Sequence, residues 1–220
     1  MASRAYYPLF ADLEGKRCIV VGGGLVAQRK VTTLLKYGAA VTVVSPTVTA
    51  RLGRSANAGT ICLIQRRFQP QDLAGAWLAY AATDDRRTNQ LVFRSAMKRR
   101  LFANVVDDAP LCSFIAPAIV RRGALVVAVS TGGASPSLAK KVRTDVGRAL
   151  GHDYVPMVRL LAGLRAVAKN KLPAYRDRKR YFDRLVHGRV FTLVKAGKTR
   201  QAKRTALTLL EQETGTNGAR

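Results

Sequence analysis

The chain has 220 residues, of which 48% are hydrophobic and 23% are charged, so it can bury a core and is not wholly disordered. It lacks an apolar run of the roughly 18–20 residues that a membrane-spanning helix needs, its start is too polar for a secretory signal, and three scattered cysteines exclude a disulfide framework; we expect a soluble cytoplasmic protein. A net charge of +25, from 38 basic and 13 acidic residues, favours an anionic partner (nucleic acid, an anionic membrane or a polyanionic small molecule), with an arginine-rich host proteome as the alternative cause.

The first half of the chain alternates short strands with helices. Short runs of apolar and β-branched residues predict five buried strands, at 17–21, 40–44, 60–64, 77–81 and 101–106. Apolar residues at helical spacing predict helices over 25–37 and 86–99. This alternation predicts an α/β fold with an N-terminal, Rossmann-like parallel sheet over residues 1–113.

The second half has a different pattern. Two short strands, at 114–120 and 124–130, are predicted to be joined by a tight turn at Arg121-Arg-Gly123. The glycine-rich loop 131–136 then precedes a helix that runs to about Leu150. Residues 151–220 contain no strand signal and carry leucines at helical spacing, so we expect a helical C-terminal region.

A glycine turn follows the first predicted strand and begins the first predicted helix. Gly22, Gly23 and Gly24 form the pattern Gly-x-Gly-x-x-Ala, which lets backbone amides approach a pyrophosphate at the helix start. The alternative is a turn that binds nothing. The second strand ends without the acidic residue that often binds a ribose; Ser45 and Thr47 could do so instead, and the choice between NAD and NADP stays open.

Two further polar clusters follow strands, where ligands of open parallel sheets bind. In the first, 82–85, we expect Thr83 to line the cofactor crevice and Asp85 to cap the next helix. The second, 104–108, includes Asn104, Asp107 and Asp108, and a carboxylate there could act as a general base. A turn with no chemical role is the alternative for this cluster.

A metal site built from protein ligands is not predicted. His152 and His187, the two histidines, lie far apart and have no cysteine or acidic residue at ligand spacing. We expect Cys112 to be a small buried residue rather than a ligand.

Taken together, the motifs resemble one family. Tyr7-Pro-Leu-Phe10, the segment from Val20 to Lys30, Ala81-Ala-Thr-Asp84, Asn104-Val-Val-Asp107, Phe114-Ile-Ala-Pro117 and Ser130-Thr-Gly-Gly-Ala-Ser-Pro136 occur in the order of the precorrin-2 dehydrogenase module of siroheme synthases. The resemblance is strong over about residues 6–150 and looser beyond.

The resemblance implies a reaction and an assembly. Members oxidise precorrin-2 to sirohydrochlorin with NAD⁺, and several then insert Fe²⁺ as the substrate of a chelatase step. They are homodimers, so the implied division is an NAD-binding domain at 1–113, a dimerisation region at 114–150 and a helical domain at 151–220. The methyltransferase domain fused in some members is not expected here, and chelatase activity is left open.

The resemblance also assigns residues. The glycine turn with Leu25 and Val26, and the loop with Pro46 and Thr47, would hold NAD. Asp107 matches the family's catalytic aspartate, and Asn104, which begins the same motif, is expected to contact the substrate. The loop with Ser130, Thr131, Gly132 and Ser135 would border the tetrapyrrole.

The net charge agrees with a substrate that carries eight carboxylates. Arg121, with Arg122, is a candidate for contacts to those carboxylates. The alternative, which the sequence favours equally, is that both arginines lie in a solvated turn and bind nothing. Two functions are alternatives to the dehydrogenase. One is a non-catalytic, dinucleotide-sensing domain, and the other is nucleic-acid binding. The second rests on charge alone, because no recognition motif accompanies it; neither specific nucleic-acid binding nor membrane binding is expected.

Overall fold

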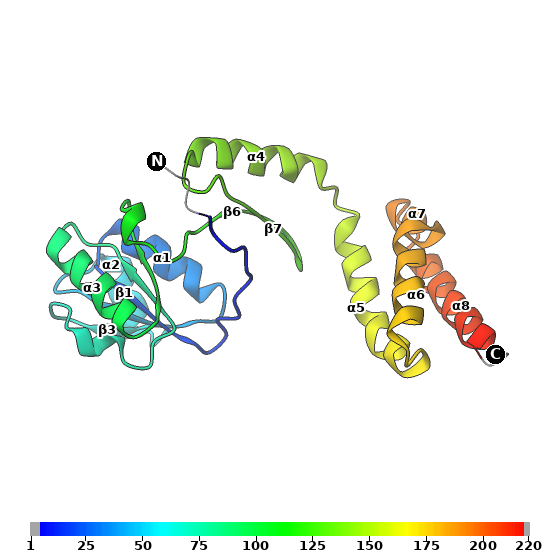
Figure 1. Cartoon of the computed structure of the whole chain (residues 1–220), viewed down its shortest axis with the longest axis horizontal. Coiled ribbons are helices and arrows are strands. Elements are labelled where there is room, and N and C mark those ends of the chain that lie inside the picture. The colour runs from blue at the N-terminus through cyan, green and yellow to red at the C-terminus, as the bar shows by residue number, and fades with distance from the viewer. Residues whose placement is uncertain (1–4, 218–220) are drawn as a thin grey trace. The chain divides into compact units, whose positions relative to one another are not determined.

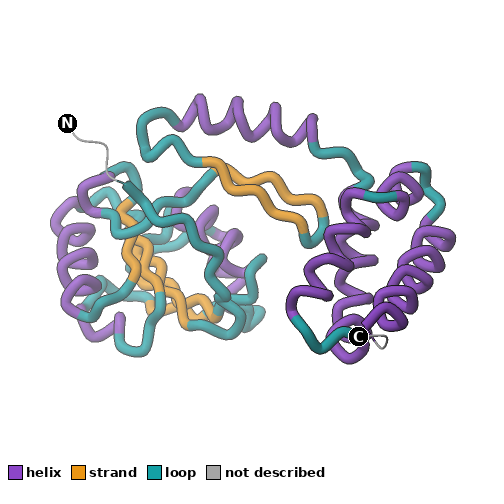
Figure 2. The backbone as a smooth tube through the Cα atoms, turned by 45° about the vertical axis from the view of Figure 1, so that its right-hand side comes forward, coloured by secondary structure: helices purple, strands orange, loops and turns teal. Residues whose placement is uncertain are grey.

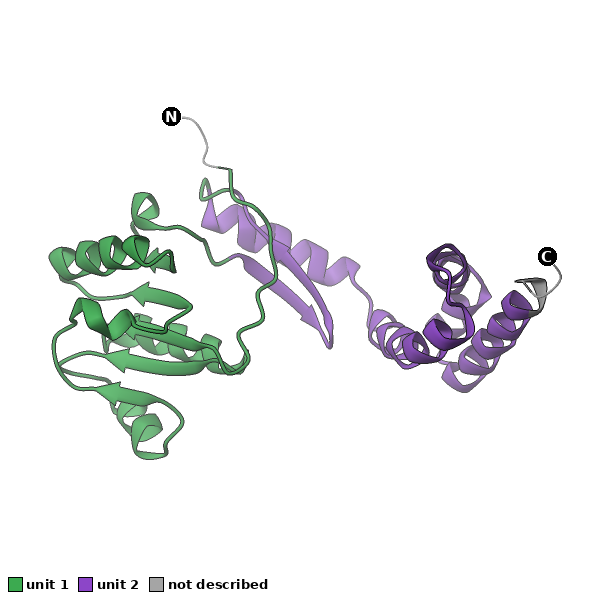
Figure 3. Ribbon diagram, turned by 60° about the horizontal axis from the view of Figure 1, so that its bottom comes forward, with its two compact units in different colours: residues 1–116, 132–134 green, residues 117–131, 135–220 purple. Residues whose placement is uncertain are grey.

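The structure, a computed structural model, describes residues 5–217, with side chains described to Thr214. It divides into two compact units (Figure 3). Unit 1 comprises residues 1–116 and 132–134, and unit 2 comprises residues 117–131 and 135–220. Each unit has a hydrophobic core of its own.

Unit 1 is a five-stranded sheet in which every neighbouring pair is parallel, in the order β3-β2-β1-β4-β5 (Figure 1). The strands are β1 Arg17–Val21, β2 Ala40–Val44, β3 Cys62–Ile64, β4 Leu78–Ala81 and β5 Phe102–Val105. The predicted parallel sheet is therefore confirmed. β3 is shorter than predicted because Thr60 donates its amide hydrogen to the carbonyl of Ser55, at the end of a helix, instead of pairing in the sheet.

Helices cover both faces of this sheet. One face packs against α1 Leu25–Leu35 and α2 Ala50–Asn57, and the other against α3 Arg86–Lys98 and a short 3-10 helix, η1 Pro70–Leu73. In β1, Cys18 and Val20 lie in the first core while Ile19 and Val21 lie in the second. Burial on both faces explains why this strand is a continuous apolar run.

Unit 2 begins with an antiparallel hairpin, β6 Ala118–Arg122 and β7 Leu125–Val129, followed by α4 Pro136–Ala149. The predicted turn at residues 121–123 was wrong by two positions. Arg121 and Arg122 belong to β6 and pair with Val126 and Leu125. The chain turns at Gly123, whose φ of +59° suits glycine.

The rest of unit 2 is helical, as predicted (Figure 2). Its helices are α5 Tyr154–Lys171, α6 Tyr175–His187, α7 Arg189–Lys195 and α8 Thr199–Asn217. They share one core, in which the buried hydroxyl of Tyr181 donates to the carbonyl of Ala206 at 2.9 Å and so links α6 to α8. No helix within residues 5–217 combines the length and the apolar character that a membrane crossing requires.

Candidate functional site

The strand order places a topological switch point between β1 and β4. The chain leaves β1 toward β2 on one side of the sheet and leaves β4 toward β5 on the other. In open α/β sheets, ligands bind outside the carboxyl ends of the strands at such a point. The turn at 22–24 and the loop at 82–85 lie there, as the sequence predicts.

The first two glycines of the turn are required by the packing of neighbouring loops. Gly22 has a φ of +121°, and a Cβ atom on it would lie 2.2 Å from the carbonyl oxygen of Ala82. A Cβ atom on Gly23 would lie 1.9 Å from the carbonyl oxygen of Thr47. The ends of β1, β2 and β4 therefore meet around backbone that cannot carry side chains.

Gly24 differs from the other two glycines, because a Cβ atom there would meet no protein atom within 4 Å. Its φ of −78° suits any residue. Neither the packing nor the backbone of this chain demands a glycine at this position. The open space beside Gly24 fits the close approach of a ligand to the backbone.

The start of α1 carries no group that would compete with an anion. Gly24 is the N-cap, no side chain caps the helix, and the first turn holds no acidic residue. Leu25, the first helical residue, is 71% exposed, and Val26 follows it. Amide groups at such a helix start suit the pyrophosphate of a dinucleotide.

The loop after β2 is partly tied to itself. Ser45 is buried, and its hydroxyl donates to the carbonyl of Thr47 at 2.7 Å, so its hydrogen is already used and its oxygen would have to accept from a ribose. Pro46 and Thr47 are exposed beside the glycine turn. The amide of Thr49 donates to the carbonyl of Gly23 at 2.9 Å and holds this loop against the turn.

The loop after β4 is organised by a residue that sequence analysis missed. Asn89 on α3 donates from its amide nitrogen to the carbonyl of Thr83 at 2.8 Å, while the Thr83 hydroxyl donates to the Asn89 side-chain oxygen at 2.9 Å. Asp85 caps α3 by accepting from the amide of Arg87 at 3.0 Å, which confirms its predicted structural role. The position of Asn89, three residues into a polar helix start, gave no signal in the sequence.

Asp107 follows β5 at the same edge of the sheet. Val106 donates its amide hydrogen to the carbonyl of Ala81 at 2.9 Å, which places this turn beside the end of β4. Asp107 is exposed and has a φ of +60°, an unusual conformation for a residue other than glycine. Asn104 is buried, and its side-chain amide donates to the carbonyl of Phe114 at 2.9 Å. That bond holds the segment after β5 against the strand, and a substrate contact by Asn104 stays a prediction.

Sequence analysis also missed Lys30, which lies above an aromatic ring near Asp107. The ammonium nitrogen of Lys30 on α1 lies 4.9 Å from the centre of the Tyr80 ring on β4. Burial and the charge of Arg29 lower the pKa of Lys30, and the charge of Asp107 opposes them. Burial raises the pKa of Tyr80 to about 12, so its hydroxyl stays protonated. The sequence signal was present, because Lys30 lies on the inward-facing stripe of α1 with Ala27 and Leu34.

The remaining candidate residues lie in the hairpin and in the loop that follows it, of which residues 132–134 belong to unit 1. Arg121 is exposed on β6, whereas Arg122 donates to the carbonyl of Gly147 at 3.0 Å. The Thr131 hydroxyl accepts from the amide of Ser135 at 3.0 Å, and the Ser135 hydroxyl caps α4. Ser130 and Gly132 flank this turn, and Gly132 has a φ of +64°.

Metal-binding groups are not gathered in this structure: residues 5–217 contain no cluster of three or more histidine, cysteine or acidic side chains that could hold an ion. Cys112 is buried, as predicted, and its thiol donates to the carbonyl of Val105 at 3.2 Å.

Comparisons with known proteins agree along the whole chain. Three family models match: one described as "Putative NAD(P)-binding" at residues 9–118, one as sirohaem biosynthesis protein central at 122–149, and one as sirohaem synthase dimerisation region at 153–210. The chain is 40% identical over 214 residues to siroheme synthase 1 of Aeromonas salmonicida, covering 97% of this chain and 46% of the relative. It is 41% identical over 207 residues to siroheme synthase 1 of Serratia proteamaculans, covering 94% and 44%. The chain thus spans about half the length of the curated relatives it matches.

A solved structure matches the chain over nearly its full length. SirC, a precorrin-2 dehydrogenase, superposes with a TM-score of 0.75 at 26% identity, covering 94% of this chain and 100% of that protein.

Proposed function

The chain belongs to the siroheme synthase family, and from that membership we propose that it oxidises precorrin-2 to sirohydrochlorin with NAD⁺ as the hydride acceptor. One structural observation carries the proposal: the open space at Gly24 and the carboxylate of Asp107 lie at the same edge of one sheet. A dinucleotide site and a base are the two parts that a dehydrogenation needs.

The residues of the glycine turn fit the dinucleotide. We assign Gly22, Gly23 and Gly24 to the pyrophosphate, together with the amides of Leu25 and Val26. The exposed Pro46 and Thr47, with the oxygen of Ser45, would contact the ribose, and Thr83 would line the other side of the crevice. The bound nicotinamide supplies the acceptor for the hydride that leaves precorrin-2.

Asp107 is assigned to the proton. Oxidation of precorrin-2 removes a hydride and a proton, and the exposed carboxylate of Asp107 would accept the proton as general base. In the chelatase reaction of several family members, the same carboxylate could accept the protons that Fe²⁺ displaces from the macrocycle. We propose this second reaction with Fe²⁺ as a substrate.

The remaining candidate residues are assigned to the tetrapyrrole. Its carboxylates would be bound by Arg121, and its rim by the loop with Ser130, Thr131, Gly132 and Ser135, with Asn104 beside Asp107. We also propose a homodimer, supported by the family model named for dimerisation at 153–210, and a division of the chain into 1–113, 114–150 and 151–220.

An anaerobic assay tests the proposal. Purified protein receives precorrin-2 and NAD⁺, and the absorbance of NADH and the spectrum of the tetrapyrrole are followed before and after addition of Fe²⁺. We expect NADH and sirohydrochlorin to form together, more slowly with NADP⁺, and siroheme to form faster than in a protein-free control. NAD⁺ binding without any NADH would contradict the dehydrogenase and favour a dinucleotide sensor.

A further inference from the structure

A basic groove opens on the helical part of unit 2 and takes no part in the proposed reaction. It has a volume of about 760 Å³ and lies between α6, the start of α7 and α8. Its floor includes Thr205 and Leu209, one turn apart on α8. Its charged lining is Arg176, Lys179, Arg180, Asp183, Arg184 and Arg189. Five of these six side chains are cationic.

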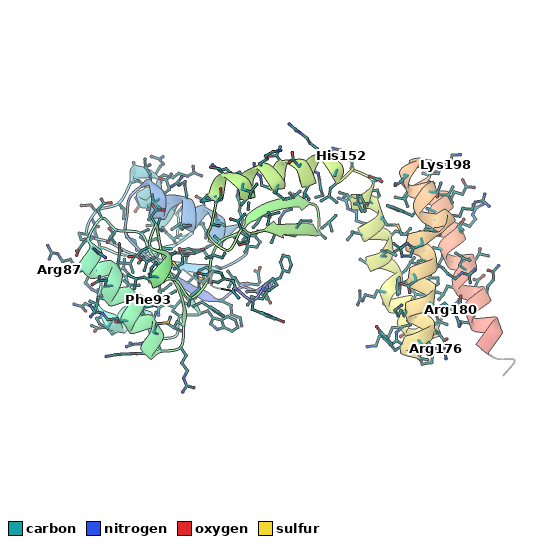
Figure 4. The ribbon with its side chains drawn as sticks, turned by 45° about the horizontal axis from the view of Figure 1, so that its top comes forward. Arg87, Phe93, His152, Arg176, Arg180 and Lys198 are labelled. Atoms are coloured by element: carbon teal, nitrogen blue, oxygen red, sulfur yellow. The ribbon has the colours of Figure 1, made fainter. Side chains whose placement is uncertain are left out.

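The sequence spacing of α6 places the cations on one face. The cationic positions 176, 179, 180 and 184 follow the three-and-four spacing of a single helical stripe, which also contains Asp183. Figure 4 labels Arg176 and Arg180 on this helix, one turn apart. Arg189 extends the stripe as the first residue of α7. Lys179 pairs with Asp183 at 2.8 Å, so the positive charge that the groove presents comes mainly from its arginines.

Two of the arginines are held in position by a buried carboxylate. Glu213 on α8 is 4% exposed, and it accepts from Arg180 at 2.7 Å and from Arg184 at 2.6 Å. Burial alone would raise the pKa of Glu213, but the hydrogen bonds from Arg184 and Arg180 outweigh it and lower the pKa. A guanidinium has five N–H donors, so each arginine keeps donors for a ligand, and each side chain remains about half exposed.

The other two arginines are not explained by stability. Among the side chains described, up to Thr214, neither Arg176 nor Arg189 makes an ion pair or a side-chain hydrogen bond, and both are exposed. Arg176 lies in the first turn of α6, where the helix dipole disfavours a cation. A position that costs stability and faces a groove of like charge is suited to a ligand that supplies the counter-charge.

We propose that this groove, formed wholly by unit 2, binds a polycarboxylate of the size of a tetrapyrrole. Its volume lies in the range of about 300–1,000 Å³ that is typical of small-molecule sites. Arginine suits carboxylates because its donors can bind both oxygens. The choice of a tetrapyrrole over other polycarboxylates rests on the proposed function.

Uroporphyrin III, a stable tetrapyrrole with eight carboxylates, is the probe. Binding is measured by calorimetry at physiological salt and without NAD⁺, on the full chain, on Arg176→Glu/Arg189→Glu, and on the control Arg159→Glu/Arg165→Glu. The control residues are exposed on α5, outside the groove, and the change in charge is the same. Circular dichroism checks that both variants are folded.

We expect the groove variant to lose one class of binding site, or to weaken it at least about tenfold, while the control keeps it. Equal losses in the two variants would overturn the proposal, because they would show only the effect of net charge. Equally tight, groove-dependent binding of inositol hexakisphosphate would also overturn it, in favour of phosphate ligands. If the protein binds uroporphyrin III in the groove but makes no NADH, the proposed function is contradicted while the groove site stands.

Discussion

The backbone of Gly23 lies so close to Thr47 that a Cβ atom on the glycine would be 1.9 Å from the threonine carbonyl oxygen. The loop after β2 therefore rests on the turn after β1, and the amide of Thr49 fastens it there. For this reason a substitution at Gly23 would disturb the packing of the two loops at this edge of the sheet, whereas a substitution at Gly24 would act on ligand binding.

Gly24→Ala should weaken NAD⁺ binding and lower the stability of the chain by no more than about 1 kcal/mol, because alanine is a poorer N-cap than glycine. The new methyl group meets no protein atom within 4 Å, and the φ of −78° tolerates alanine. The methyl group would occupy the space that the pyrophosphate needs, so we expect the dissociation constant of NAD⁺ to rise at least about tenfold, the loss of one hydrogen bond to a charged group. Calorimetry with NAD⁺ and thermal unfolding measure the two effects. Gly53→Ala, also in open space but inside α2, is the control: it should leave NAD⁺ affinity unchanged, and it should raise the unfolding temperature slightly because alanine is the better helix residue.

Asp107→Asn should lower turnover of precorrin-2 by about 10²–10⁴-fold, because the amide cannot accept the proton. Asparagine tolerates the positive φ of this position better than alanine, so the change tests the carboxylate and leaves the backbone intact. NAD⁺ affinity should stay within about twofold, since the substitution lies outside the glycine turn. Asp108→Asn, the adjacent carboxylate, is the control; an equal loss in both variants would remove Asp107 from the assigned role.

We predict that the Lys30 ammonium attracts a carboxylate of the tetrapyrrole. Lys30→Met should therefore raise KM for the tetrapyrrole at least about tenfold while NAD⁺ affinity is unchanged. Methionine keeps the apolar stem that packs on Tyr80 and removes the cation near Asp107. Steady-state kinetics with each substrate varied in turn make the comparison. Lys36→Met, at the C-cap of the same helix, is the matched control. A change in kcat alone would count against a role of Lys30 in attracting substrate carboxylates.

The ion pair between Arg66 and Asp72 should make unit 1 sensitive to acid. Arg66 donates to both oxygens of the nearly buried Asp72, at 2.9 and 2.6 Å, and this hydrogen bonding lowers the Asp72 pKa. A lowered pKa in the folded state means that the stabilisation is present above the unfolded pKa of about 3.9 and is lost as pH falls through the folded value.

We expect Asp72→Asn to lower the free energy of unfolding by about 1–3 kcal/mol at neutral pH, nearer the lower value because Arg66 is partly exposed, and by less as the pH falls below about 4. The fluorescence of Trp77, the single tryptophan, reports on unit 1. Asp145→Asn, which breaks the exposed pair with Lys141, should leave the free energy of unfolding nearly unchanged, because solvent screens that pair.

Apolar runs predicted the sheet well because burial on both faces of a parallel strand leaves little choice of residue, as in β1. Asp85 was predicted as a cap because capping depends only on local sequence. The turn at Gly123 was misplaced because two arginines were interpreted as turn residues, although cross-strand pairing keeps them in β6. α2 was not predicted because only Leu52 on it is buried, which leaves no apolar stripe.

The missed site residues depend on contacts between distant segments. Asn89 acts on Thr83 across a loop, and Lys30 meets Tyr80 only when α1 packs on β4. Nothing in the sequence separates Gly24, which faces open space, from Gly23, which is packed against Thr47. Composition gave the net charge but could not show that Arg176 and Arg189 share a groove.

The φ of +60° at Asp107 also limits which sequences can be found at this position. In a saturation library, valine, isoleucine and threonine would be removed by backbone strain before their chemistry mattered, whereas glycine and asparagine would be retained in folded protein. Inactive variants from such a library would therefore have two different causes, backbone strain and loss of the carboxylate. Only variants that tolerate the left-handed conformation measure what the carboxylate contributes.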